Sequence, residues 1–210
     1  MEKELTVLLS KLQGIAQTGK AYAQDPYDIE RYDELQKITA EMIQLLSPMV
    51  DDRQLQLYME TDQGYATPKV DVRAVIFDEK NRLLFVKEKS DQHWALPGGW
   101  ADIGYSPKEI AEKETWEEAG IKVQAERLIA LRDKHKHPYP PSLTYTYKLF
   151  IACVFQSGEL KGGLETSDAA FFSLSDIDSL SLSEERNTYE DIQMLFDDYM
   201  NPGKRTVLCD

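Results

Sequence analysis

The spacing of apolar residues changes once along the chain, within residues 61–69, and this change constrains the fold more than any other feature. Over residues 5–46 the apolar positions recur every three or four residues, which is the period of an amphipathic helix. From residue 70 onward, apolar and polar residues alternate over several runs, which is the period of a β-strand. The sequence therefore predicts an α+β protein, with a small N-terminal helical domain over residues 1–64 and a mixed domain over residues 65–210.

The N-terminal domain is predicted to contain two amphipathic helices. Pro26 interrupts the first helical pattern, and Asp28 is placed to cap the second helix. A pair of helices this small cannot bury its apolar face alone, so it packs either on the rest of the chain or on a second copy of the protein. We interpret the pair as a docking or dimerisation element, with a structural cap on the same chain as the alternative.

The mixed domain is predicted to begin with a β-hairpin, in which residues 70–76 and 83–86 pair across a turn at 78–81. Alternating apolar residues also predict a long strand over 143–155. The other expected elements are a helix at about 107–119, strands near 121–132, a Pro-rich loop at 133–142 and a final helix near 184–200 capped by Ser183.

Composition and charge exclude several classes of partner. The chain has 24 Lys and Arg against 37 Asp and Glu, a net charge of −13, which opposes binding of an extended nucleic acid. No apolar stretch approaches the ~18–20 residues of a membrane span, and the N-terminus has no signal-peptide cleavage site. Cys153 and Cys209 are far apart and form no disulfide framework. We therefore expect a soluble, cytoplasmic protein without a membrane partner.

A short helix with defined ends is expected at 107–119, next to a glycine-rich turn. Ser106 and Glu109 have the spacing of a capping box with proline at the first helical position, and Gly120 is placed to end the helix in the left-handed conformation. The Gly-Gly pair at 98–99 allows the backbone to bend and approach this helix. The sequence thus predicts a flexible turn facing a helix that is fixed at both ends.

Three glutamates lie on one face of this helix. Glu114, Glu117 and Glu118 stand at positions i, i+3 and i+4, which places their Cβ atoms within about 5–6 Å of their neighbours. Like charges this close repel unless a cation neutralises them, and carboxylate oxygens suit Mg²⁺ or Mn²⁺. A solvated acidic face is the alternative for any Glu-rich helix, but the adjoining glycine turn favours a metal cluster. A phosphate substrate would then bind through the metal.

The segment from Gly99 to Ile121 resembles the signature of the Nudix hydrolases. The signature is a series of glycines, glutamates, an arginine and aliphatic residues at fixed spacings, and the matching residues here are Gly99, Glu114, Glu117, Glu118, Gly120 and Ile121. The sequence departs from it at three positions, where Tyr105 replaces a glutamate, Lys113 the arginine and Thr115 an aliphatic residue. Lys113 keeps the positive charge that orients a catalytic glutamate but lacks the bidentate fork of arginine.

A wider resemblance covers nearly the whole chain. Tyr27-Asp28-x-Glu30-Arg31-Tyr32, Val70-Asp-Val-Arg73 and Gly98-Gly-Trp-Ala-Asp102 are similar to two-domain Nudix hydrolases that act on nucleoside diphosphates linked to another moiety, such as ADP-ribose and CDP-choline pyrophosphatases. The resemblance implies a Nudix α/β/α sandwich with a mixed sheet, Mg²⁺ or Mn²⁺ as cofactor, and a homodimer in which the N-terminal helices take part. It also implies attack of water on a P–O–P bond of a small-molecule nucleoside diphosphate derivative.

The resemblance also implies roles for individual residues. Glu114, Glu117 and Glu118 would be the metal ligands, with the carbonyl of Gly99 as a further donor. One of Glu117 and Glu118 would also orient the attacking water, and which of them is the base stays open. Lys113 would orient the catalytic carboxylates. We treat Glu117, Glu118 and Lys113 as the candidate catalytic residues.

Five further residues are candidates for contact with the substrate, each with a structural alternative. Glu165 and Asp168 lie where related sequences carry an acid, but they are otherwise loop charges that cap the next strand. His135 lies in a basic loop as a proton carrier or phosphate contact, or is merely exposed there. Arg73 suits a bidentate phosphate contact or a surface ion pair. Trp100 can stack on a base or cover a choline cation, or serve packing.

Two other functions remain as alternatives. The first is a nucleotide-sensing Nudix module with weak or no catalysis; a sensor needs no metal cluster, so the three glutamates argue against it. The second is an enzyme that also acts on RNA 3′ ends, because a short terminus can reach the metals even though the net charge of −13 opposes tracking along a long strand.

Overall fold

The computed structural model describes residues 2–46, 55, 59, 63–204 and 206–210, which form two compact units. The first unit comprises Met1–Pro68 with Pro141–Tyr145, and the second comprises Lys69–Pro140 with Thr146–Asp210. The division after Pro68 lies within the segment where the apolar period changes. None of the helices in the described ranges has the length and apolar composition needed to cross a membrane.

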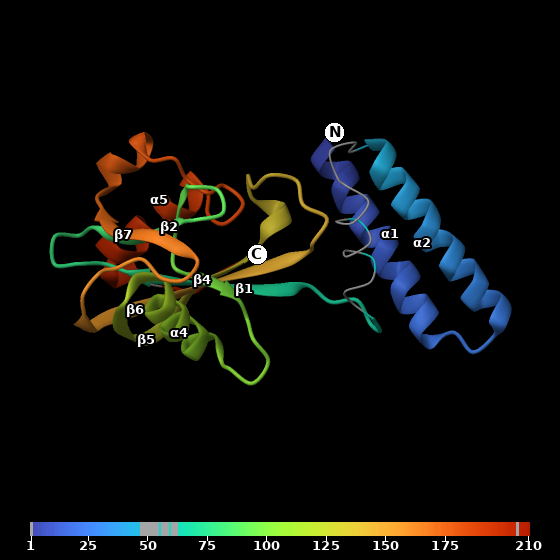
Figure 1. The fold of residues 1–210 in the computed structure, drawn as a ribbon, viewed down its shortest axis with the longest axis horizontal. Coiled ribbons are helices and arrows are strands. Elements are labelled where there is room, and N and C mark those ends of the chain that lie inside the picture. The colour runs from blue at the N-terminus through green and yellow to red at the C-terminus, as the bar shows by residue number, and fades with distance from the viewer. Residues whose placement is uncertain (1, 47–54, 56–58, 60–62, 205) are drawn as a thin grey trace. The chain divides into compact units, whose positions relative to one another are not determined.

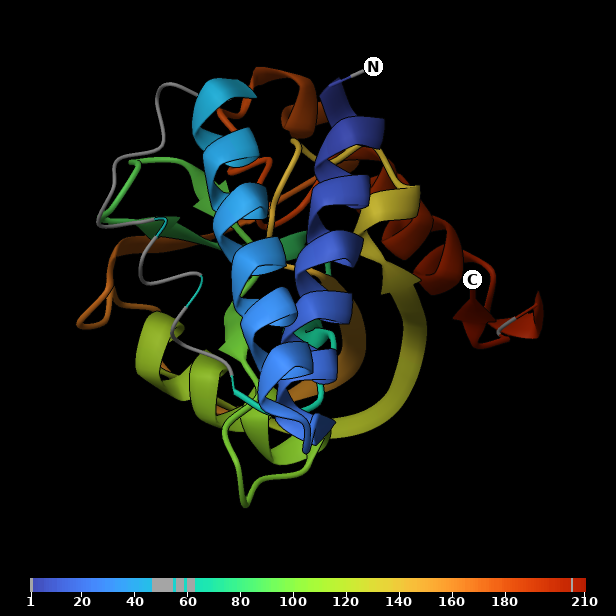
Figure 2. The same cartoon turned by 90° about the vertical axis from the view of Figure 1, so that its right-hand side faces the viewer.

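The first unit contains the two predicted helices, α1 (Glu2–Tyr22) and α2 (Pro26–Leu46), which lie side by side in both views of the fold (Figures 1 and 2). Leu9 of α1, Ile43 of α2 and Leu55 are buried together and form its small apolar core. Because this core uses one side of each helix, other apolar residues of α1 and α2 are left exposed.

The predicted cap of α2 is wrong by three residues. Asp25, not Asp28, caps the helix: its Oδ1 accepts hydrogen bonds from the backbone N–H groups of Tyr27, at 2.8 Å, and Asp28, at 3.3 Å. Pro26 is already the first helical residue, so the capping position falls immediately before it. The Asp28 side chain instead pairs with Arg31 one turn further along.

The second unit is built on two sheets. The five-stranded sheet has the order β4-β1-β6-β5-β8 and the three-stranded sheet has the order β3-β2-β7. The strands are β1 (Lys69–Ile76), β2 (Leu83–Glu88), β3 (Trp94–Ala95), β4 (Gly98–Trp100), β5 (Ile121–Asp133), β6 (Thr146–Gly158), β7 (Thr166–Phe172) and β8 (Leu208–Cys209). The helices are α4 (Pro107–Ala119) and α5 (Tyr189–Met200), with 3₁₀ turns at Lys134–Lys136, Leu174–Ser179 and Pro202–Lys204. Strand β1 is parallel to β6 and antiparallel to β4, so the larger sheet is mixed.

Alternate residues of β1 face two different apolar cores. Ala74 belongs to the core that contains Ile110 of α4, whereas Val75 belongs to the core that contains Ile192 of α5. The two helices therefore cover opposite sides of the strands (Figure 1). This arrangement confirms the predicted α+β fold, an α/β/α sandwich preceded by two helices.

The predicted hairpin is wrong in its pairing, although both of its strands exist. Strand β1 lies between β4 and β6 in one sheet, and β2 lies between β3 and β7 in the other. A single antiparallel bridge between Phe77 and Leu83 joins the two strands where the chain turns. Both edges of β1 are already paired, so β2 completes a second sheet instead.

The last helix also begins later than its sequence pattern predicts. Thr188, not Ser183, caps α5, and Thr188 forms a capping box with Asp191. The hydroxyl of Ser183 donates to Asp91 at 2.8 Å, so Ser183 serves a loop contact instead of a helix end. The segment between these two residues consequently stays outside the helix, where it contacts the turn after β2.

Candidate active site

Helix α4 has the ends that its sequence predicts. Ser106 accepts a hydrogen bond from the backbone N–H of Glu109, whose carboxylate bonds back to the N–H of Ser106. At the other end Gly120 has φ +72°, the left-handed conformation that favours glycine. A Cβ on Gly120 would also lie 2.5 Å from the Lys161 side chain. The helix that carries the three glutamates is therefore held rigidly at both ends.

The predicted turn at Gly98–Gly99 is wrong in its position, because the chain bends at Pro97 and both glycines begin strand β4, which pairs with β1. We call residues 96–99 the glycine turn, and at Gly98 it lies too close to β1 for any side chain. Gly98 has φ +143°, and a Cβ there would lie 2.0 Å from the carbonyl oxygen of Val72. Its backbone N–H donates to Oε2 of Glu118 at 2.8 Å. Gly99 lies beside Glu114, because a Cβ at Gly99 would be 3.7 Å from that carboxyl group. The turn and the acidic face of α4 thus meet at two points.

Lys113 lies between two of the predicted ligands. Its ammonium is 2.9 Å from Oε1 of Glu114, 3.1 Å from Oε2 of Glu117 and 3.6 Å from Oδ2 of Asp102. Hydrogen bonds to Glu114 and Glu117 raise the pKa of Lys113 above its ordinary value. Lys113, which stands at the position of the signature arginine, therefore does bind Glu114 and Glu117. It makes one contact with each carboxylate, whereas an arginine could make a bidentate one.

Glu118 differs from the other two glutamates because it is turned inward and is only 7% exposed. Burial raises the pKa of Glu118 to about 8, although Arg73 and the Gly98 N–H act in the opposite direction. The charges of Glu88 and Glu114 add to the increase. Arg73 and the Gly98 N–H offset only part of the cost of burying the negative charge of Glu118. A bound cation would stabilise this ionised form further.

The donor set fits a hard divalent cation. Glu114, Glu117, Glu118 and the Gly99 carbonyl provide oxygen atoms alone, which are the ligands that Mg²⁺ and Mn²⁺ prefer. Among the residues that the structure describes, no three His, Cys, Asp or Glu side chains already surround a common point. Lys113 would have to release an oxygen of Glu114 or Glu117 for these ligands to converge.

A cluster of buried charged residues contacts the glycine turn from the protein interior. Arg73 donates through Nη1 to the carbonyl of Leu96 at 3.0 Å, and its Nε and Nη2 both contact Asp71. Lys148, 1% exposed, donates to Oδ2 of Asp71. Burial alone would raise the pKa of Asp71, but Arg73 and Lys148 hold it below its ordinary value. Arg73 therefore contacts the glycine turn from the protein interior.

The other predicted substrate contacts lie in several places. Trp100 follows Gly99 directly and is 54% exposed. Glu165 is exposed, and its charge contributes to the raised pKa of Glu88. Asp168 is exposed on β7 opposite Lys87. His135 lies in the 3₁₀ turn after β5, where its Nδ1 is 3.8 Å from Asp133.

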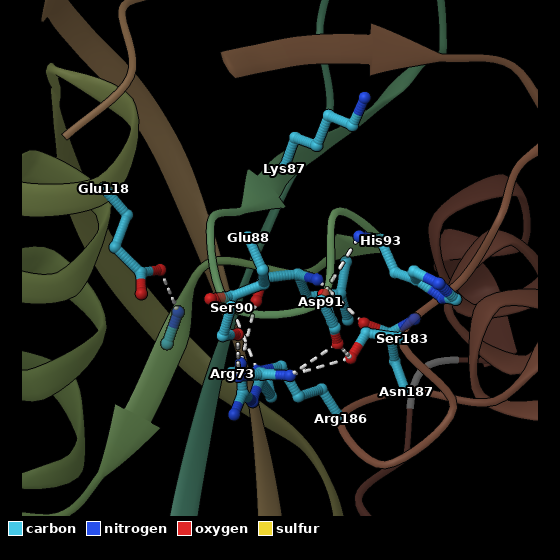
Figure 3. A network of polar contacts seen from close by, with 12 residues as sticks. Arg73, Lys87, Glu88, Ser90, Asp91, His93, Glu118, Ser183, Arg186 and Asn187 are labelled. Atoms are coloured by element: carbon cyan, nitrogen blue, oxygen red, sulfur yellow. Dashed lines mark hydrogen bonds and ion pairs between the residues drawn. The ribbon is translucent and has the colours of Figure 1, made fainter. Parts of the chain in front are cut away.

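Sequence reasoning missed a second buried carboxylate near the site, Glu88 at the end of β2. Burial raises the pKa of Glu88, while Arg186 and Arg73 act to lower it. Arg186 is 3.1 Å from Oε1 of Glu88 and also donates to Asp91 (Figure 3). In the sequence Glu88 is one of several charged residues at a strand end, and no local pattern distinguishes it from the others.

Comparison with known proteins agrees with this geometry. Residues 67–193 match the NUDIX domain, and residues 3–49 match a UDP-X-like, N-terminal oligomerisation domain. A Bacillus subtilis protein named "Putative ADP-ribose pyrophosphatase YjhB" is 43% identical over 202 residues, 94% of this chain and 93% of that protein.

Two solved structures are also similar to this chain. The crystal structure of a UDP-X diphosphatase is 32% identical, covers 100% of both chains and has a TM-score of 0.63. The crystal structure of an ADP-ribose pyrophosphatase from Streptococcus suis is 38% identical, covers 69% of this chain and 100% of that chain, and has a TM-score of 0.61. The chain therefore belongs to the Nudix family and is a Nudix pyrophosphohydrolase with an N-terminal oligomerisation domain.

Proposed function

We propose that the protein hydrolyses the pyrophosphate bond of a nucleoside diphosphate linked to another moiety, of the ADP-ribose or CDP-choline type. The products would be a nucleoside monophosphate and the phosphorylated moiety. The observation that carries this proposal is the meeting of the Gly98–Gly99 turn with Glu114 and Glu118 on a helix fixed at both ends. The names of the Bacillus subtilis and Streptococcus suis relatives support the choice of ADP-ribose.

In the proposed reaction, Mg²⁺ or Mn²⁺ would be held by Glu114, Glu117, Glu118 and the Gly99 carbonyl. Such an ion, when bound, polarises phosphoryl oxygens and lowers the pKa of an attacking water. Glu117 or Glu118 would orient the attacking water toward phosphorus and accept its proton. Lys113 keeps the carboxylate oxygens that do not bind the ion in position, from its place between Glu114 and Glu117.

The part of the substrate that does not react is proposed to lie along the exposed end of β4. Trp100 presents its ring to solvent next to Gly99, where it can stack on a base or cover a choline cation. Of the two acidic candidates, Glu165 is the more favoured because its charge acts on Glu88. We retain His135 and Asp168 as proposed outer contacts, and we propose that Arg73 acts through the Leu96 carbonyl that it binds.

A substrate panel tests the reaction class. We expect release of nucleoside monophosphate from ADP-ribose or CDP-choline with Mg²⁺ or Mn²⁺, and none in excess chelator, since the α4 carboxylates alone carry no Lewis acid. NADH, UDP-glucose and a dNTP complete the panel as alternative substrates. Binding of these nucleotides without cleavage of any of them would contradict the proposal and favour the sensor function.

We also propose that the protein is a homodimer through its N-terminal helices. Leu8, Ile15 and Tyr22 repeat at seven-residue intervals along α1 and are 60%, 62% and 70% exposed, so they form one uncovered apolar stripe. The match of residues 3–49 to an oligomerisation domain supports a second copy as the partner of this stripe.

Placing a charge in the α1 stripe tests the dimer. Ile15→Glu should shift the mass measured by light scattering from twice 24.1 kDa to 24.1 kDa, because a carboxylate would lose its water in the interface. Lys37→Glu, at an exposed polar position of α2, is the matched control and should stay dimeric. A dimeric Ile15→Glu variant or a monomeric unmodified protein would refute the proposed interface.

The proposed location is the cytoplasm. Both cysteines are free, and burial raises the pKa of the Cys153 thiol to about 12, which leaves it unreactive. A chain with free thiols suits a reducing compartment.

A further inference from the structure

The segment that precedes α5, residues 181–188, is hydrogen-bonded to the strand that leads into the glycine turn. The N–H of Trp94 donates to the carbonyl of Ser181 at 2.8 Å, and the N–H of Ser183 donates to the carbonyl of Trp94 at 2.9 Å. Two residues beyond Trp94, the N–H of Leu96 donates to the side-chain Oδ1 of Asn187 at 2.8 Å. Asn187 thus reaches the turn from a segment that sequence analysis did not connect with it.

Every backbone polar group from the Leu96 N–H to the Gly98 N–H has a partner, and the partners come from different elements. Asn187 accepts from Leu96 N–H, and Arg73 of β1 donates to Leu96 O. The N–H of Ala74 donates to Pro97 O at 2.8 Å, and Glu118 of α4 accepts from Gly98 N–H. A shift of the Leu96 peptide therefore moves the two residues that face Glu118 and Glu114.

Arg186 fixes the same segment against the turn after β2. Its guanidinium contacts Glu88 at 3.1 Å and Asp91 at 3.0 Å, and its Nη2 is 3.3 Å from the Ser90 hydroxyl. Figure 3 shows Arg186 and Ser183 facing Asp91, with the Arg186 guanidinium also beside Glu88. Asn187 is therefore carried by a segment with little freedom to move.

The asparagine itself is unusual, because half of its amide group has no partner. Asn187 is 0% exposed, and within the described part of the chain its Nδ2 makes no hydrogen bond. Burying an unpaired donor lowers the stability of the folded protein. The position therefore uses asparagine for the acceptor that its Oδ1 presents to the N–H of Leu96.

We propose that Asn187 is a positioning residue for the hydrolysis proposed above, on which this inference rests. By holding the Leu96 peptide, Asn187 keeps the Gly98 N–H on Glu118 and the Gly99 carbonyl beside Glu114. It acts on the turn that supplies and orients the metal ligands, and it touches neither the ligands nor the substrate.

Three readouts of Asn187→Ala test this role. Amide exchange measured by NMR should become at least ~10-fold faster at both Leu96 and Gly98, and Mn²⁺ binding to the chelator-stripped protein should weaken about 10-fold, in the range typical for loss of an outer-shell partner. The kcat should fall about 10- to 100-fold with KM changed by less than ~3-fold, because turn geometry and not substrate contact is altered. Asn201→Ala, at the exposed C-terminal end of α5, is the control and should change none of these.

Amide exchange and Mn²⁺ binding need no substrate, so they test Asn187 even if the substrate panel is negative. Unchanged Gly98 exchange and Mn²⁺ affinity in Asn187→Ala would overturn the proposal, as would a raised KM with unchanged kcat. Asn187→Asp, which keeps the acceptor, gives a second test if the alanine variant does not fold. It should retain slow exchange of the Leu96 amide, and rapid exchange there would equally overturn the role of Oδ1.

Discussion

Replacing Glu118 by glutamine should lower the metal-dependent turnover by more than about 100-fold, which exceeds the usual effect of losing an outer-shell partner. Glutamine preserves the shape of the side chain and an oxygen that can accept from the Gly98 N–H. It removes the negative charge that a divalent cation requires. The loss should therefore appear in kcat at saturating Mg²⁺, with the fold unchanged.

In metal-free protein, Glu118→Gln should affect stability against unfolding favourably, whereas its effect on turnover is a loss. The folded-state pKa of Glu118 is about 8, above the ordinary value of 4.5, so folding favours the protonated form. Its contribution to stability is present below pH 4.5 and is lost as pH rises through about 8. Glutamine does not titrate. In the presence of chelator, the free energy of unfolding of Glu118→Gln should therefore fall less between pH 4.5 and about 8 than that of the unmodified protein.

Two comparisons make the Glu118 prediction specific. Glu117→Gln should also be strongly impaired, because Glu117 is a proposed ligand on the same face. Glu112→Gln is the matched control on α4, where the side chain accepts from the N–H of Ala125, and it should keep normal turnover. If Glu117→Gln and Glu118→Gln both remain near normal at saturating Mg²⁺, the assignment of the α4 glutamates is wrong.

Replacing Asp71 by asparagine should destabilise the protein by about 3–5 kcal/mol, the usual effect of removing one partner from a buried ion pair. Asp71 is the shared counterion of Arg73 and Lys148, all three of which are buried. Without it, two cations lie close together away from water. Urea unfolding at pH 7, followed by circular dichroism, measures the change.

The other members of the cluster provide the control. Lys148→Met should change stability by much less, because Asp71 still pairs with Arg73. The double variant Asp71→Asn with Lys148→Met should recover part of the loss, since one of the two unpaired cations is gone. Equal stability of Asp71→Asn and the unmodified protein would show that the cluster does not hold the turn as described.

The parts of the site that depend on neighbouring residues were predictable from sequence. The ends of α4 follow from Ser106, Glu109 and Gly120, whose capping contacts are all local. The placement of Glu114 and Glu118 on that helix follows from its period alone. These features need no knowledge of how the chain folds back on itself.

The parts that sequence reasoning missed depend on contacts between distant segments. Asn187 and Leu96 are 91 residues apart in the sequence, and no periodic pattern predicts a contact between them. The pairing of β2 with β7 instead of β1 likewise depends on which strand edges are already occupied. At the start of α2, Pro26 selected Asp25 over Asp28 as the capping residue. At the start of α5, the contact of Ser183 with Asp91 left Thr188 as the cap.

Hydrolysis of ADP-ribose in H₂¹⁸O is the most direct test of the central claim, that the α4 glutamates support attack of water on a pyrophosphate bond. With Mg²⁺, mass spectrometry should find AMP and ribose 5-phosphate with a single ¹⁸O in one of the two products, and CDP-choline is the substitute if ADP-ribose is not cleaved. Glu118→Gln should give almost no labelled product. Cleavage that persists in chelator or in Glu118→Gln, or no cleavage of either compound, would contradict the account.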